Sequence, residues 1–82
     1  MITVRVPATL RRGSDTVQIA EPVRSLSELI VALDRRLPGF ARGVREAMFN
    51  FAVNDELILQ GINAHPLKDG DRVEVVPTIS GG

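Results

Sequence analysis

The sequence has no cysteine, no tryptophan and no tyrosine, and its only histidine is His65. Without cysteine the chain forms no disulfide, carries no side-chain persulfide and offers no thiolate as a nucleophile or metal ligand. A single histidine excludes a site built from several histidines within one chain. The phosphate-binding loop G-x-x-x-x-G-K is absent as well. This inventory indicates a partner or carrier protein without a cofactor of its own rather than an enzyme.

An excess of either charge is also missing. Ten Lys and Arg residues balance ten Asp and Glu residues in 82, whereas a domain that mainly binds nucleic acid carries a basic excess. The longest apolar run, 29–33, is far too short to span a membrane, and no signal-peptide hydrophobic region follows Met1. We therefore expect one small cytoplasmic domain whose partners are neither nucleic acid nor membrane.

Apolar and polar residues alternate in several short segments, as is typical of half-buried strands. Pro7 and Pro77 are expected to end the first and last of these strands, and turns are expected at 54–55 and 68–71. A loop at 11–15 joins the first two strands into a hairpin. The strands are expected at 2–6, 16–20, 49–53, 56–60 and 72–76.

The strongest helix signal lies between the second and third strands. Ser25 and Glu28 fit the S-x-x-E capping box, in which a hydroxyl and a carboxylate each accept a backbone N–H at the helix start. Pro38-Gly39 ends the helix, and residues 40–48 predict a loop with a short helical turn. One apolar stripe runs along the helix: Leu26, Leu29, Ile30, Leu33 and Leu37.

The order strand, strand, helix, strand, short strand, strand predicts an α+β fold, with one main helix packed on a small mixed sheet. A helical crossover is long enough for the strands on either side of it to run parallel. This pattern matches the β-grasp, or ubiquitin-like, fold, in which the first and last strands are neighbours at the sheet centre. We expect residues 1–77 to form the domain and residues 78–82 to form a flexible tail.

The C-terminal tail is the most informative segment for function. Five residues extend at most about 17 Å, and two residues without Cβ atoms can pass through a channel too narrow for other side chains. We expect the first four tail residues to thread into a partner's active site and Gly82 to present its main-chain carboxylate there. The four are Thr78, Ile79, Ser80 and Gly81.

Five segments together resemble the ubiquitin-like sulfur carrier proteins. This family contains the small subunit of molybdopterin synthase, the thiamine sulfur carrier and the carriers for cysteine synthesis. The resemblance covers essentially the whole chain, and its most specific part is the order Asp-Gly-Asp turn, apolar strand, proline and diglycine. The segments are 4–11, 25–33, 51–56, 67–73 and 76–82.

The resemblance implies a function in sulfur transfer. An E1-like adenylyltransferase/sulfurtransferase would join the Gly82 carboxylate to AMP, and a sulfur donor would convert it to a thiocarboxylate. A sulfur-accepting synthase, such as the molybdopterin synthase large subunit or a cysteine synthase, would then take the sulfur. The ending 79–82 resembles the molybdopterin branch, whereas 7–11 and 53–56 resemble carriers for cysteine or specialised metabolites.

The tail leaves two other functions open. A ubiquitin-like modifier would use Gly82 to form isopeptide bonds with lysines of other proteins. A plain β-grasp interaction module would carry the glycines incidentally, and deleting Gly82 would leave its binding intact.

Other polar residues have simpler explanations than a site. His65 precedes Pro66 in a predicted loop, and Asp69 and Asp71 flank a turn glycine without the rest of a calcium loop. Residues 1–48 have eight arginines against five acids, whereas 49–82 have two basic residues against five acids. We hypothesise that this acidic half lies near the tail and steers docking onto a basic rim of the activating enzyme.

Overall fold

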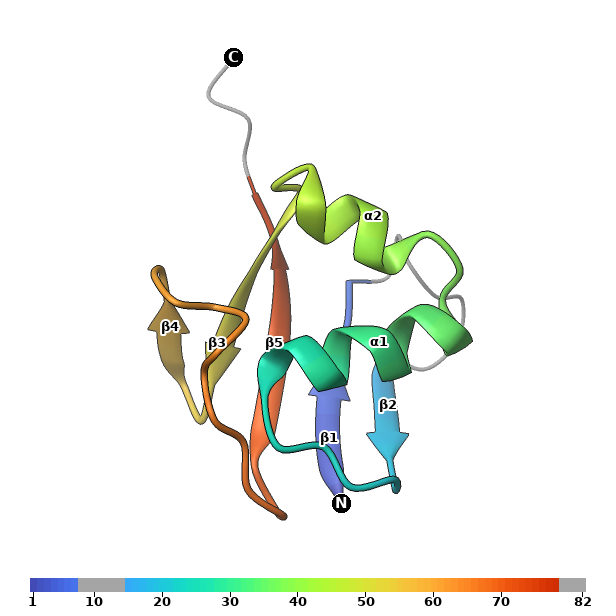
Figure 1. Cartoon of the computed structure of the whole chain (residues 1–82), viewed down its shortest axis with the longest axis vertical. Coiled ribbons are helices and arrows are strands. Elements are labelled where there is room, and N and C mark those ends of the chain that lie inside the picture. The colour runs from blue at the N-terminus through green and yellow to red at the C-terminus, as the bar shows by residue number, and fades with distance from the viewer. Residues whose placement is uncertain (8–14, 79–82) are drawn as a thin grey trace.

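The computed structural model describes residues 1–7 and 15–78 and shows one five-stranded mixed sheet with a helix across one face (Figure 1). The expected α+β class is confirmed. The strands are β1 (Ile2–Arg5), β2 (Thr16–Ile19), β3 (Phe49–Val53), β4 (Glu56–Ile58) and β5 (Arg72–Pro77), and the helices are α1 (Leu26–Arg36) and α2 (Phe40–Arg45).

The last strand lies at the centre of the sheet. The strand order is β2-β1-β5-β3-β4, with β5 parallel to β1 and antiparallel to β3. Val4 pairs with Val73, and Phe51 pairs with Val75. The predicted neighbourhood of the first and last strands is therefore confirmed, and β5 is held by hydrogen-bonded partners on both sides.

The core lies between the sheet and α1. Alternate strand residues point into it, which is the period expected for strands with one buried face. Of the predicted helix stripe, Leu26, Leu29, Ile30 and Leu33 are buried, and Leu37 packs against the core while partly exposed.

The start of α1 differs in one detail from the predicted capping box. The Ser25 hydroxyl accepts the Glu28 N–H at 3.4 Å, as expected. The Glu28 carboxylate, however, accepts the N–H of Arg24 at 2.9 Å rather than that of Ser25. The chain enters the helix from a short bridge between Ser25 and Pro66, with the Leu26 N–H donating to the His65 carbonyl. The Arg24 carbonyl in turn accepts the Leu67 N–H at 2.9 Å, so both sides of residue 24 are hydrogen-bonded.

Some predicted boundaries shift. β1 and β2 each end one residue earlier than expected, and β4 stops at Ile58. Pro77 belongs to β5 as the partner of Phe49, and its missing N–H breaks no bond to β3 because the Thr78 N–H donates the next ladder bond, to Met48. The ambiguous stretch 40–48 contains the six-residue helix α2. Within the expected loop at 11–15, positions 11–14 lie outside the described residues.

Candidate functional site

The root of the C-terminal tail leaves directly from the central strand. Val73 and Val75 of β5 are 2% and 3% exposed, so the strand is fixed in the core. Thr78 follows β5 and is the last described residue. Of the predicted tail, only Thr78 therefore has a position, and the others lie outside the described residues: Ile79, Ser80, Gly81 and Gly82.

Thr78 is held to the turn between α2 and β3 by two hydrogen bonds. Its backbone N–H donates to the Met48 carbonyl at 2.9 Å. Its hydroxyl Oγ1 donates to the Ala47 carbonyl, also at 2.9 Å. The predicted boundary between domain and tail, placed after residue 77, thus leaves out one residue that is bonded to the domain.

The turn that receives these bonds is a Schellman motif at the end of α2. The Met48 N–H donates to the Gly43 carbonyl at 2.9 Å, and the Ala47 N–H donates to the Val44 carbonyl at 3.0 Å. Ala47 has a φ of 58°, in the left-handed region where glycine is usual. Both carbonyls that bind Thr78 therefore belong to a turn whose own hydrogen bonds are satisfied.

Aromatic packing supports the same turn from the core side. The rings of Phe40 and Phe49 stack with centroids 5.3 Å apart, and Phe40 meets Phe51 edge to face at 6.2 Å. Gly43 of α2 lies so close to the Phe49 ring that a Cβ atom there would approach Cε2 to 2.7 Å. The position of α2 relative to the end of β5 is thus fixed by packing as well as by hydrogen bonds.

Four of the five acidic residues in 49–82 lie at the end of the sheet opposite the tail root, so the structure does not support the expected acidic surroundings of the tail. Asp55 and Glu56 lie at the β3–β4 turn, and Asp69 and Asp71 lie in the turn before β5. The Asn54 N–H joins the β3–β4 turn to the Arg72 carbonyl at the start of β5. Six strand steps, or about 20 Å, separate that end of β5 from Thr78. The net charge of residues 49–82 did not reveal this separation, because β5 runs from the acidic end of the sheet to the end that carries the tail.

Charged residues of both signs lie near the root: Arg5, Asp15 and Glu74 line a shallow hollow together with Val76 and Pro77, and others belong to α2. Arg42 and Arg45 lie in its last turn and Glu46 at its C-cap, next to the turn that binds Thr78. Arg42 Nε pairs with Glu46 Oε1 at 3.2 Å. A predominantly acidic rim around the tail root is therefore wrong for the part of the chain that is described.

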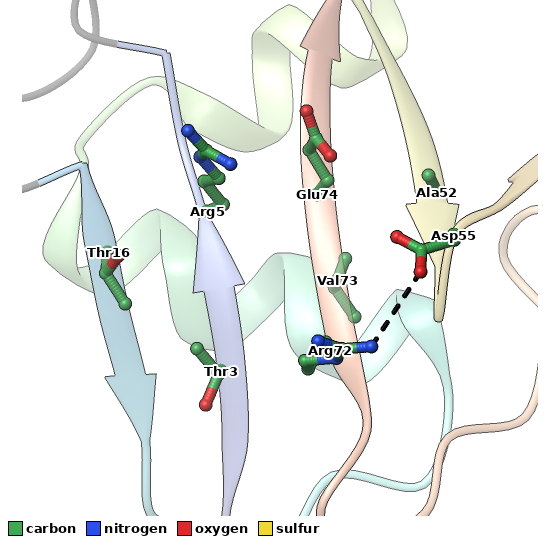
Figure 2. Close-up of a pocket in the computed structure, with 8 residues that line it drawn as sticks. All are labelled: Thr3, Arg5, Thr16, Ala52, Asp55, Arg72, Val73 and Glu74. Atoms are coloured by element: carbon green, nitrogen blue, oxygen red, sulfur yellow. Dashed lines mark ion pairs between the residues drawn. The ribbon is translucent and has the colours of Figure 1, made fainter.

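The open face of the sheet contains a shallow hollow, shown in Figure 2. It lies on the side away from the helices and is floored by small side chains such as Ala52. Arg72 Nη2 lies 3.8 Å from Asp55 Oδ2, and Arg5 is paired in register with Glu74. Two basic and two acidic side chains balance each other here, so the hollow has no net charge that would favour an anion or a cation.

His65, Asp69 and Asp71, for which the sequence predicted turns, lie outside the helices and strands. The His65 N–H donates to the Ile62 carbonyl, and its own carbonyl accepts from α1. The Asp71 carboxylate accepts hydrogen bonds from the Asn54 amide at 3.0 Å and from the Lys68 N–H at 2.8 Å, and these bonds lower the pKa of Asp71. Residues 1–7 and 15–78 contain no group of three potential metal-ligating side chains. No helix within these ranges has the length and apolar character needed to cross a bilayer.

Sequence reasoning missed Ala47 and Met48 as the anchor of the tail. Both contribute only carbonyl oxygens, which every residue has, so the side chains carry no signal. Glycine or asparagine at position 47 would have indicated a left-handed helix end, but alanine does not.

Comparison with known proteins gives a consistent assignment. A family model described as the ThiS family matches residues 4–82. A chain of the BexX/CysO complex from Amycolatopsis orientalis is 30% identical, with a TM-score of 0.76 and full coverage of both chains. CysO from Mycobacterium tuberculosis, described as an antigen, is 25% identical with a TM-score of 0.81, over 96% of this chain and 100% of that one.

A third structure contains subunits 1 and 2 of the molybdopterin-converting factor from Helicobacter pylori 26695. Its matching chain is 27% identical with a TM-score of 0.60, over 99% of this chain and 97% of that one. The search of curated proteins gave no significant match. The structural likeness confirms the β-grasp fold, and the family model covers both the domain and the diglycine. The chain therefore belongs to the ThiS family of ubiquitin-like sulfur carriers.

Proposed function

We propose that this protein carries sulfur as a thiocarboxylate on Gly82. An E1-like adenylyltransferase/sulfurtransferase activates the Gly82 carboxylate, and a synthase of cofactor or metabolite biosynthesis accepts the sulfur. The observation that carries the proposal is the family match, which runs through residue 82 and so includes the diglycine. The attachment of the tail to the central strand supports it, because a rigid root gives the partner a defined place to find the tail.

The chemistry needs two steps, because a free carboxylate is a poor electrophile. In the first step a carboxylate oxygen of Gly82 attacks the α-phosphate of ATP, and pyrophosphate leaves. In the second step sulfide attacks the acyl carbon of the adenylate, and AMP leaves with the bonding electron pair. Splitting one difficult substitution into two easier ones is the logic of covalent catalysis. In this proposal the partner supplies ATP, sulfide and the catalytic groups, and this chain supplies the acyl group.

The acceptor belongs to molybdopterin synthesis or to the synthesis of cysteine or a specialised metabolite. Complexes with partner proteins occur among the similar structures, namely BexX/CysO and the two subunits of the molybdopterin-converting factor. The TM-scores to the CysO structures, 0.76 and 0.81, exceed the 0.60 to the molybdopterin-converting factor. We therefore give molybdopterin no preference over the metabolite branch.

Intact-mass measurement tests the proposal directly. The full chain is incubated with its activating enzyme, ATP and sulfide, and the expected product is heavier by the difference between one sulfur and one oxygen atom. Omitting ATP should abolish the shift. An unchanged mass, with an activating enzyme shown to charge another carrier, would contradict the proposal.

A chain lacking Gly82 is the matched control. It still ends in a glycine carboxylate, but that carboxylate is about 3.5 Å closer to the body. We expect no charging, because the acyl carbon then falls short of the partner's catalytic groups. Charging of the shortened chain at the normal rate would show that Gly82 is not the carrier residue.

The second candidate function, a ubiquitin-like modifier, rests on the same tail. It predicts covalent attachment of Gly82 to lysine side chains. Mass spectrometry of tryptic peptides from cells that express the tagged protein distinguishes the two. Lysines that carry the tail would favour the modifier, and a thiocarboxylate without such peptides favours the carrier.

A further inference from the structure

Thr78, the last described residue, is bonded to the domain through its side chain as well as through its backbone. The Thr78 N–H to the Met48 carbonyl continues the β3–β5 ladder by one step beyond the pair Phe49–Pro77. Any residue except proline could make that bond. The side-chain bond from Oγ1 to the Ala47 carbonyl is additional. Only threonine and serine have a hydroxyl on Cβ that can donate it.

The acceptor of this hydroxyl bond cannot easily move away. Ala47 is the left-handed residue of the Schellman turn, with a φ of 58°, and its own N–H is bound to Val44. The next residue is bound back to Gly43, which packs against the Phe49 ring. The Ala47 carbonyl therefore points toward Thr78 from a turn that is closed by hydrogen bonds and supported by the core.

Two bonds to consecutive carbonyls restrict the direction of residue 78 as well as its position. With a single bond, residue 78 could still rotate about its donor atom. Its backbone N–H and its hydroxyl are both bound, at 2.9 Å each, and together they fix its orientation. Thr78 itself is half-buried, although its hydroxyl bond lies at the exposed surface of the domain.

We propose that Thr78 is a positioning residue that sets the direction in which the tail leaves the domain. This inference rests on the proposed carrier function and adds that the tail must leave the domain from a fixed point. We call the two Thr78 hydrogen bonds the clamp. The four residues beyond it, 79–82, extend at most about 14 Å. A fixed departure point reduces the number of arrangements that must be searched before the Gly82 carboxylate meets ATP. The Thr78 hydroxyl therefore contributes to turnover in the docked complex rather than to docking.

Two substitutions separate the hydroxyl from the rest of the side chain. Thr78→Val keeps the β-branched shape and the backbone N–H but removes the hydroxyl, and Thr78→Ser keeps the hydroxyl. The readout is ATP–pyrophosphate exchange by the activating enzyme as a function of carrier concentration, which gives kcat and KM. We expect Thr78→Val to lower kcat by roughly fivefold, the size of one net hydrogen bond, with an unchanged KM. Thr78→Ser should restore most of kcat.

Each other result overturns the inference. A Thr78→Val chain with the wild-type kcat shows that the clamp does not affect turnover. A raised KM with unchanged kcat shows that residue 78 contributes to docking. Equal losses in Thr78→Ser and Thr78→Val show that the methyl group, and not the hydroxyl, matters.

A measurement without the partner separates failure of this inference from failure of the proposed function. Backbone 15N relaxation should give residue 78 an order parameter near 0.85, typical of rigid backbone, in the wild type and in Thr78→Ser. The value should fall in Thr78→Val. A low value in the wild type would overturn the clamp even if Gly82 is charged normally. Conversely, a rigid Thr78 in a chain that is never charged would reject the carrier function and leave the clamp in place.

Discussion

At the scale of single residues, Gly43 is the one glycine within 1–7 and 15–78 whose missing side chain makes room for a neighbour. It lies inside α2 and is buried, and the Phe49 ring occupies the space that a Cβ atom would need. Glycine in a helix normally costs about 0.5–1 kcal/mol relative to alanine. The close approach to Phe49 accounts for a glycine at a position where alanine would otherwise be more stable.

Gly43→Ala should therefore destabilise the protein despite improving helix propensity. A contact of 2.7 Å forces the ring of Phe49 away from Phe40, with which it stacks. Overpacking of this kind costs typically about 1–3 kcal/mol, so we expect the free energy of unfolding in urea to fall by about 1 kcal/mol after the propensity gain is offset. Arg45→Ala, an exposed position in the same helix, is the control and should change stability by less than about 0.5 kcal/mol. A Gly43→Ala variant as stable as the wild type would show that the ring has room to move.

Residues that act through their side chains were predictable from the sequence, and those that act through the backbone were not. The apolar stripe of α1 was predicted from its helical period, and four of its five residues are buried while Leu37 is partly exposed. Thr78 was predicted only as one of four tail residues that thread into a partner, and its bonds to the domain were not predicted. Its two acceptors, the carbonyls of Ala47 and Met48, are peptide groups that the sequence does not distinguish from any others.

At the scale of elements, the end of α2 combines a helix terminus with the anchor of the tail. The same turn closes the helix through Schellman bonds and offers two carbonyls to Thr78. α2 was predicted only as a short helical turn within 40–48, because six residues make fewer than two helical turns and no capping side chain marks the start at Gly39. Long amphipathic α1, by contrast, was identified by its stripe and its N-cap serine.

Ala47→Gly should stabilise the protein. A left-handed conformation costs a non-glycine residue about 1–2 kcal/mol, and glycine at this position removes that cost but adds freedom to the unfolded chain. We expect a net gain of about 0.5 kcal/mol in the free energy of unfolding, measured by urea denaturation. Ala41→Gly, within α2, is the matched control and should destabilise by about 0.5–1 kcal/mol. Equal losses in both variants would contradict the assignment of position 47 as a strained helix end.

At the scale of the whole molecule, charge is arranged along the sheet and not by halves of the sequence. The acidic turns lie at the start of β5, and the tail leaves from its end, next to α2. Charge summed over consecutive residues therefore does not describe the surroundings of the tail, and steering by the acidic half stays a hypothesis. The pairing of the first and last strands at the sheet centre was predicted from the β-grasp pattern, and the Thr78 bonds lie one residue beyond the predicted end of the domain.

Two truncations test where the body ends. Removal of residues 79–82 should change the thermal midpoint by less than about 3 °C, the effect of a surface change in a domain of this size. Removal of 78–82 also deletes both Thr78 bonds, and should lower the free energy of unfolding by roughly 1–3 kcal/mol more. Calorimetry of the two truncated chains gives the comparison. Identical midpoints would place the boundary back at residue 77.

The parallel pairing of β1 with β5 has a mechanical consequence. The N-terminal end of β1 and the tail end of β5 point in opposite directions along adjacent strands (Figure 1). Tension between these two ends loads the inter-strand hydrogen bonds in shear, so they must rupture together rather than unzip singly. A protein gripped by its tail and pulled by its N-terminus would therefore resist extension until the central ladder fails in one event.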